Sequence, residues 1–178
     1  MPSDEALLES LLAGDVRSFD ALYARHERRL FGFIRRHHPG IEDAEDVLHE
    51  TFLALLRDGA GARGAPSLRA WLFQVARNLC LNRHRSRRRA GQALAADAPV
   101  APAAPSFPGQ ALEERQRLAL LHAAIARLPV DLAEVYQLRA SGMSYDEMAS
   151  VLAIPIGTVK SRMHAVVHRL REEVHREL

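Results

Sequence analysis

The chain has 178 residues, of which 48% are hydrophobic and 26% charged, and its formal net charge is +2 at neutral pH. These values are typical of globular proteins and unlike those of disordered or membrane-spanning chains, and the length allows one ordinary domain or two small ones. The start, MPSDEALLES, lacks the pattern of a secretory signal and the single cysteine, Cys80, has no disulfide partner, so we expect a cytoplasmic protein without membrane insertion.

Apolar residues recur at helical spacing from the start of the chain, and no alternating strand pattern of useful length appears. The first helix is expected within 4–13, where Gly14 ends it because glycine tolerates the left-handed conformation that closes a helix. The second, capped by Asp15 or Ser18, should continue to the break at 38–40. Its expected core face carries Phe19, Leu22, Tyr23, Leu30, Phe31 and Ile34.

Two more helices are expected before residue 90. The third should run from about Glu42 to Arg57, and the fourth from a cap at Ser67 into the stretch RHRSRRR. Trp71 is interpreted as a core residue rather than as a platform on which bases stack. The predicted buried residues of the third helix are Ala44, Val47, Leu48, Thr51, Phe52 and Leu55, and the fourth helix should continue through Trp71, Leu72, Val75, Ala76 and Leu79.

Residues 90–112 hold four of the nine prolines and a single charge, and their apolar residues show neither helical nor strand spacing. This composition predicts an extended, partly stiff linker. The sequence therefore predicts an all-α protein with two small helical domains, at 1–89 and 113–178, joined by a flexible linker at 90–112.

Beyond the linker, helices are expected at about 113–127 and 131–140, with a break at Leu128-Pro129 between them. Gly142 should end the second of these helices. Ser144 and Glu147 then have the spacing of a capping box, in which each side chain accepts a hydrogen bond from a backbone N–H near the other.

A short helix to Leu152, a tight turn at 153–156 and a longer last helix have the plan of a helix-turn-helix motif, whose second helix enters the major groove. An ordinary helical hairpin with a solvated basic face is the alternative. A nucleotide cradle would need a glycine-rich loop after a strand, which is not found here. The last helix should bury Val159, Met163, Val166, Val167, Leu170 and Val174, leaving Thr158, Lys160, Ser161, Arg162 and Ala165 outward.

Two charged clusters precede the linker. The stretch 83–89 has five arginines in seven residues, so it is either a solvated helix end or a surface that binds polyanions. In the third helix, Asp43, Asp46 and Glu50 lie at spacings of three and four along one side. They form either a solvated acidic face or a docking surface for a basic partner.

No residue pattern indicates catalysis or a bound metal. His164 and His168 share a helix face but lack the glutamate of a HExxH motif between them. Glu45, His49 and Glu50 lack matching ligands on a second helix. We therefore predict no catalytic residue, no metal site and no cofactor.

In order along the chain, DAEDVLHETFLALLRD, WLFQVARNLCLNRHRSRRR, a Pro/Ala-rich linker and SYDEMASVLAIPIGTVKSRM resemble the extracytoplasmic-function (ECF) group of bacterial RNA polymerase sigma factors. The resemblance covers nearly the whole chain outside the linker. It implies a region-two-like bundle that docks on the polymerase clamp and helps to open the minus-ten element. It also implies a region-four-like helix-turn-helix domain that reads the minus-thirty-five element.

Residue by residue, the resemblance implies three surfaces. The core-polymerase surface would consist of Asp43, Glu45, Asp46 and Glu50. The minus-ten surface would consist of Arg77, Asn78, Arg83, Arg85, Arg87 and Arg88, with the loop at 58–67 toward an extruded base. The minus-thirty-five surface would consist of Thr158, Lys160, Ser161 and Arg162.

The resemblance further implies a non-catalytic specificity subunit whose partners are the clamp and flap of core polymerase, promoter DNA and an anti-sigma factor. The sequence departs from the family at several positions. Asn82 replaces a frequent aspartate, Leu56 a frequent tryptophan, and Asp131 and Ala133 replace arginines. Ala153 stands at a turn position where glycine is common. Two other functions stay open, a decoy that sequesters an anti-sigma factor and a stand-alone helix-turn-helix repressor.

Overall fold

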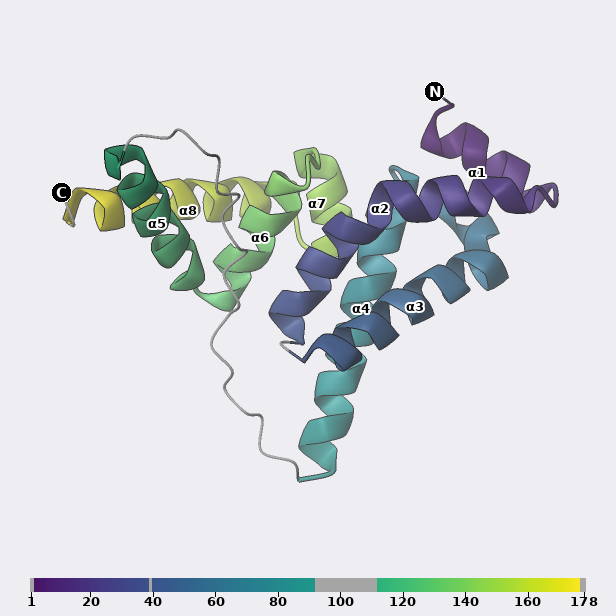
Figure 1. Ribbon diagram of the computed structural model, residues 1–178, viewed down its shortest axis with the longest axis horizontal. Coiled ribbons are helices and arrows are strands. Elements are labelled where there is room, and N and C mark those ends of the chain that lie inside the picture. Colours follow the sequence, from purple (N-terminus) through teal and green to yellow (C-terminus); the bar gives the residue numbers. More distant parts are fainter. Residues whose placement is uncertain (1, 39, 92–111, 177–178) are drawn as a thin grey trace.

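The computed structural model describes residues 2–38, 40–91 and 112–176, and over these ranges the chain is helical and contains no strand (Figure 1). Of the predicted linker at 90–112, all but the two ends lies outside the described residues. The described elements are α1 (Asp4–Leu12), α2 (Val16–His37), α3 (Ile41–Asp58), the 3-10 helix η1 (Gly59–Gly64), α4 (Leu68–Arg89), α5 (Leu112–Ala126), α6 (Val130–Ala140), α7 (Tyr145–Leu152) and α8 (Ile156–Arg176).

Helices α1 to α4 form a bundle whose core comes mainly from α2, α3 and α4. On α3, all six residues predicted to be buried are buried. On α2, Leu22, Leu30 and Ile34 are fully buried, whereas the three predicted aromatic residues are only partly buried and pack against the core. Trp71 also packs against this core, as predicted.

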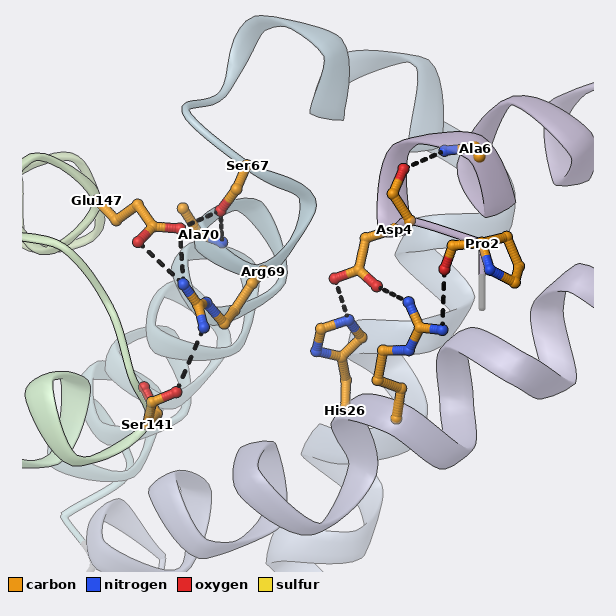
Figure 2. A network of polar contacts seen from close by, with 11 residues as sticks. Pro2, Asp4, Ala6, His26, Ser67, Arg69, Ala70, Ser141 and Glu147 are labelled. Atoms are coloured by element: carbon orange, nitrogen blue, oxygen red, sulfur yellow. Dashed lines mark hydrogen bonds and ion pairs between the residues drawn. The ribbon is translucent and has the colours of Figure 1, made fainter.

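The N-terminal helix α1 is fastened to α2 by polar contacts as well as by Leu7 and Leu8. Asp4 accepts a hydrogen bond from Arg25 and lies 2.8 Å from Nε2 of His26 (Figure 2). His26 is almost fully buried, and burial lowers its pKa more strongly than the Asp4 carboxylate raises it.

In the C-terminal part, α8 lies along α5 and α6, while α7 packs on α8. Val159 and Val166 are the buried residues of α8, and Met163 and Leu170 pack beside them. The prediction for Val167 was wrong: it is 40% exposed, because a helix turns about 100° per residue and carries it away from the stripe of Val166. Ala165, predicted to face outward, packs against Leu128, Leu132 and Val166.

The predicted helix ends are confirmed. Ser67 accepts a hydrogen bond from the Ala70 N–H at 3.1 Å, and both hydrogen bonds of the capping box between Ser144 and Glu147 are formed. Gly142 adopts φ +88°, a left-handed conformation that suits glycine. The turn between α7 and α8 places Ala153 in the left-handed region as well, with φ 54° and ψ 45°.

The sequence predicts two tethered bundles and does not predict a contact between them, but the structure contains one. Helix α7 packs directly on α4 (Figure 1). Leu138, Met143, Met148 and Val151 belong to the same apolar cluster as the core of the first bundle. The two helical parts therefore share a core across α4 and α7.

Candidate nucleic-acid interface

The start of α8 presents the residues predicted to read a duplex. Lys160 and Ser161 are exposed, and Thr158 and Arg162 are partly exposed. The Ser161 hydroxyl donates to the carbonyl of Thr158 at 3.0 Å, and Nε of Arg162 lies 3.6 Å from a carboxylate oxygen of Asp131. An acid of α6 therefore lies close to the first turns of α8.

The basic end of α4 lies against the acidic side of α3. Nη2 of Arg83 is 2.8 Å from Glu50, and its Nη1 is 3.7 Å from Asp46. Arg87 donates a hydrogen bond to Asp43, and this bond, more than the surrounding charges, lowers the pKa of the Asp43 carboxyl. Two of the predicted minus-ten arginines thus contact three of the predicted polymerase-binding acids along one edge.

Arg77, the third arginine of this set with a partner, points toward the C-terminal part instead. Its Nε and Nη2 donate to the two carboxylate oxygens of Glu134 on α6, at 3.0 and 3.3 Å. Nε2 of His37 lies 3.5 Å from the same carboxylate. Burial, with the nearby charges of His84, His38 and two arginines, lowers the pKa of His37 to about 4, so this imidazole is neutral near pH 7.

A second polar contact joins the start of α4 to α7 (Figure 2). Nη2 of Arg69 donates to both carboxylate oxygens of Glu147, at 3.0 and 3.1 Å, and the Ser67 hydroxyl donates to one of them. Burial would raise the pKa of Glu147, but the hydrogen bonds from Ser67, the Ser144 N–H and Arg69 outweigh it and lower the pKa to about 2. Glu147 is therefore ionised, and both of its carboxylate oxygens accept hydrogen bonds.

The remaining predicted residues are open to solvent. Asn78, Arg85 and Arg88 are exposed on α4. Glu45 lies on a different side of α3 from Asp46 and borders a shallow hollow of about 420 Å³, together with Tyr23, Glu27, Arg28, Phe31, Leu48 and His49. The structure thus divides the predicted minus-ten set into exposed residues, residues paired with acids of α3 and one residue paired across the two parts.

Sequence reasoning missed three residues of this arrangement, Glu134, His37 and Arg69. Glu134 is 8% exposed, and it occupies a position in α6 where the sequence shows only one acid among apolar neighbours. The one local signal in the sequence is an acid that stands between apolar residues. If such an acid is buried, it is nearly always paired with a cation or a hydrogen-bond donor. Its partner is far away in sequence and could not be identified from spacing.

The described residues contain no group of three or more histidine, cysteine, aspartate or glutamate side chains arranged to hold a metal ion. Cys80 is buried, and burial raises the pKa of its thiol to about 12, so the thiolate form is scarce near neutral pH. Among the helices of the described ranges, none combines the length and the apolarity that a membrane crossing requires.

Comparison with known families gives two matches in the same order as the helical parts. The family model for Sigma-70 region 2 matches residues 22–90, and that for Sigma-70 region 4 matches residues 118–170. Together they cover more than half of the chain.

Curated relatives and a solved structure agree with these matches. The chain is 31% identical to RNA polymerase sigma-H factor of Pseudomonas aeruginosa over 98% of this chain and 93% of the relative. It is 33% identical to ECF RNA polymerase sigma factor SigM of Mycobacterium tuberculosis over 90% of this chain and 79% of the relative. The fold resembles that of sigma factor RpoE bound to the anti-sigma factor NepR from Bartonella quintana, with a TM-score of 0.68, 24% identity, and coverage of 90% of this chain and 98% of that chain.

Proposed function

The chain belongs to the extracytoplasmic-function group of the bacterial sigma-70 factors, and we propose that its two helical parts bind different elements of the promoter. As an alternative sigma factor it acts in transcription initiation, with RNA polymerase and promoter DNA as partners. Residues 1–89 would bind core polymerase and the minus-ten element, residues 113–178 would read the minus-thirty-five element, and residues 90–112 would link them. A linker lets two modest DNA contacts act together by raising their effective concentration.

Core polymerase would dock its clamp on the acidic side of the first bundle, through Asp43, Glu45, Asp46 and Glu50, and its flap on the second part. Several features of α3 support the clamp contact. Its acids are partly or fully exposed, and Leu53 and Leu56 on the same helix are each 51% exposed. Charges combined with exposed apolar side chains are typical of a protein interface.

Promoter DNA would contact α4 at Arg77, Asn78, Arg83, Arg85, Arg87 and Arg88, and α8 at Thr158, Lys160, Ser161 and Arg162. The single observation that carries the minus-thirty-five assignment is the start of α8, which follows a tight turn and presents Lys160 and Ser161 to solvent while Val159 is buried. Arginine predominates at the α4 surface, and its planar guanidinium suits both phosphate and base edges.

Regulation would come from an anti-sigma factor, as the complex of RpoE with NepR suggests for this fold. The subunit would act in the cytoplasm and would not catalyse a reaction itself. Catalysis would remain with core polymerase, and this chain would supply only promoter selection and melting.

Reconstituted transcription tests the function. Purified chain added to core RNA polymerase should start transcription at a restricted set of promoters, which start-site mapping after induced expression would identify. Binding of the reconstituted complex to these promoters should fall as salt rises, because phosphate neutralisation releases counterions. Transcription unchanged by adding the chain would reject the assignment and favour the decoy, whereas DNA footprints independent of polymerase would favour the repressor.

A further inference from the structure

We propose that Glu9 is a positioning residue for recognition of the minus-ten element, because it holds the 3-10 helix η1 in place through an ion pair with Arg63. The role of η1 rests on the proposed function and on the resemblance that puts the loop at 58–67 toward an extruded base. The contact itself is a property of this chain. The match to Sigma-70 region 2 begins at residue 22, so α1, which carries Glu9, lies before it.

The sequence of η1, GAGARG, gives this segment few means of fixing its own shape. Three of its six residues are glycines, which have more backbone freedom than any other residue, and two are alanines. A 3-10 helix of this length is uncommon, because its hydrogen-bond geometry is poorer than that of an α-helix. Arg63 is therefore the one residue of η1 whose side chain can reach far into a neighbouring element.

Glu9 of α1 binds that side chain. Nε and Nη2 of Arg63 donate to the two carboxylate oxygens of Glu9, at 2.8 and 2.7 Å. This forked geometry fixes both the distance and the direction of the guanidinium. The hydrogen bond from Arg63 is the main cause that lowers the pKa of the Glu9 carboxyl, so the pair is ionised at neutral pH.

Apolar contacts from α1 and α4 support the first half of η1. Gly59 is buried. A Cβ added at Gly59 would lie 3.5 Å from a methyl group of Leu8 and 3.7 Å from one of Leu12, so α1 approaches the start of η1 closely. A Cβ at Gly61 would lie 3.6 Å from Nε1 of Trp71 on α4. The ion pair adds a polar contact to α1 in the second half.

Helix α1 is itself fixed to the first bundle, so its position determines that of η1. At its start, Asp4 lies 2.8 Å from Nε2 of His26 and accepts a hydrogen bond from Arg25 (Figure 2). Leu7 and Leu8 are buried. The ion pair of Glu9 therefore connects η1 to a helix that is packed on α2 and not to a loose chain end.

The exposure of the ion pair separates its effect on η1 from the stability of the fold. The side chains of Arg63 and Glu9 are 55% and 58% exposed. Exposed pairs contribute little to global stability, so loss of this pair should leave the bundle folded and loosen only η1. A loop that is not held in one geometry discriminates less between the right and the wrong base.

Amide hydrogen exchange of the free, full-length chain, followed by mass spectrometry, tests the positioning without polymerase. In Glu9→Gln, the amides of 59–64 should exchange about threefold faster than in the wild type, the size expected for loss of an exposed pair. The matched control is Glu5→Gln, the same chemical change at an exposed glutamate of α1 for which the described ranges contain no ion pair. The control should exchange like the wild type.

A reversed pair separates positioning from a direct DNA contact of Arg63. Glu9→Arg combined with Arg63→Glu restores opposite charges with their places exchanged, so it should return both the amide exchange of 59–64 and base discrimination toward wild-type values. If Arg63 bound DNA itself, Glu9→Gln would leave discrimination intact and the reversed pair would lose promoter binding, which would overturn the proposal. Circular dichroism and a urea transition check each fold, and Arg63→Gln replaces Glu9→Gln if that variant does not fold.

Promoter opening by the holoenzyme gives the functional arm, on a promoter found by start-site mapping and on versions with each minus-ten base replaced. Glu9→Gln should lower discrimination about threefold at one base position and leave core binding unchanged. An equal loss at every position would overturn the specificity role, and unchanged amide exchange of 59–64 would overturn the positioning role. Wild-type chain that fails to start transcription would overturn the proposed function, while the exchange data would still decide whether Glu9 positions η1.

Discussion

Replacing Ala153 by glycine should stabilise the protein, because this alanine sits in a conformation that L-residues avoid. Its φ of 54° and ψ of 45° are left-handed, and its side chain is exposed, so little packing is lost with the methyl group. The strain relieved is about 1 to 1.5 kcal/mol. Glycine also gives the unfolded chain more freedom, which costs about 0.7 kcal/mol. The net gain should be about 0.5 kcal/mol, or roughly 1 to 2 °C in Tm for a chain of this size.

Ala24→Gly provides the comparison, since Ala24 is exposed in the middle of α2 and has right-handed helical geometry. That variant should lose about 1 kcal/mol. The two alanine-to-glycine changes should therefore differ by about 1.5 kcal/mol in urea unfolding followed by circular dichroism. Equal destabilisation by both would refute the reasoning about the turn.

Three further predictions concern function and pH. Asp46→Arg should weaken binding of core polymerase about tenfold in a fluorescence titration. Arg162→Ala should keep core binding but lower promoter affinity about tenfold to a hundredfold in a binding assay with the holoenzyme. Glu147, with its pKa lowered to about 2, should contribute about 3 kcal/mol that is fully present above about pH 5 and lost as pH falls toward 2. Acid unfolding of Glu147→Gln should lack this component, and an unchanged acid transition would contradict it.

Local rules explain how much of the fold the sequence predicts. The buried face of α3 was identified completely, because an amphipathic helix marks its own inner side by spacing. The capping box of Ser144 and Glu147 is also predictable from the sequence, because both of its residues lie within one helical turn. The error at Val167 arose where two valines stand side by side and only one can face inward.

The contact between the two parts could not be predicted, because its partners are far apart in sequence. Arg69 and Glu147 are separated by 78 residues, and nothing in their local spacing indicates that they meet. Glu147 was interpreted as a cap, which is true but incomplete. Likewise, the acids of α3 and the arginines of α4 were assigned to different surfaces, whereas folding brings three of those acids against Arg83 and Arg87.

This shared edge decides how the polymerase contact has to be tested. Asp46 lies 3.7 Å from Arg83, so Asp46→Arg removes an acid and also repels an arginine assigned to DNA. Glu45 points to a different side of α3, toward the hollow beside Tyr23, so Glu45→Arg changes the acidic surface without placing a cation at Arg83. If the clamp binds this helix, both variants should weaken core binding, but only Asp46→Arg should also change the salt dependence of promoter binding. If both variants bind core polymerase as tightly as the wild type does, the acids of α3 pair with the arginines of α4 and do not bind the polymerase.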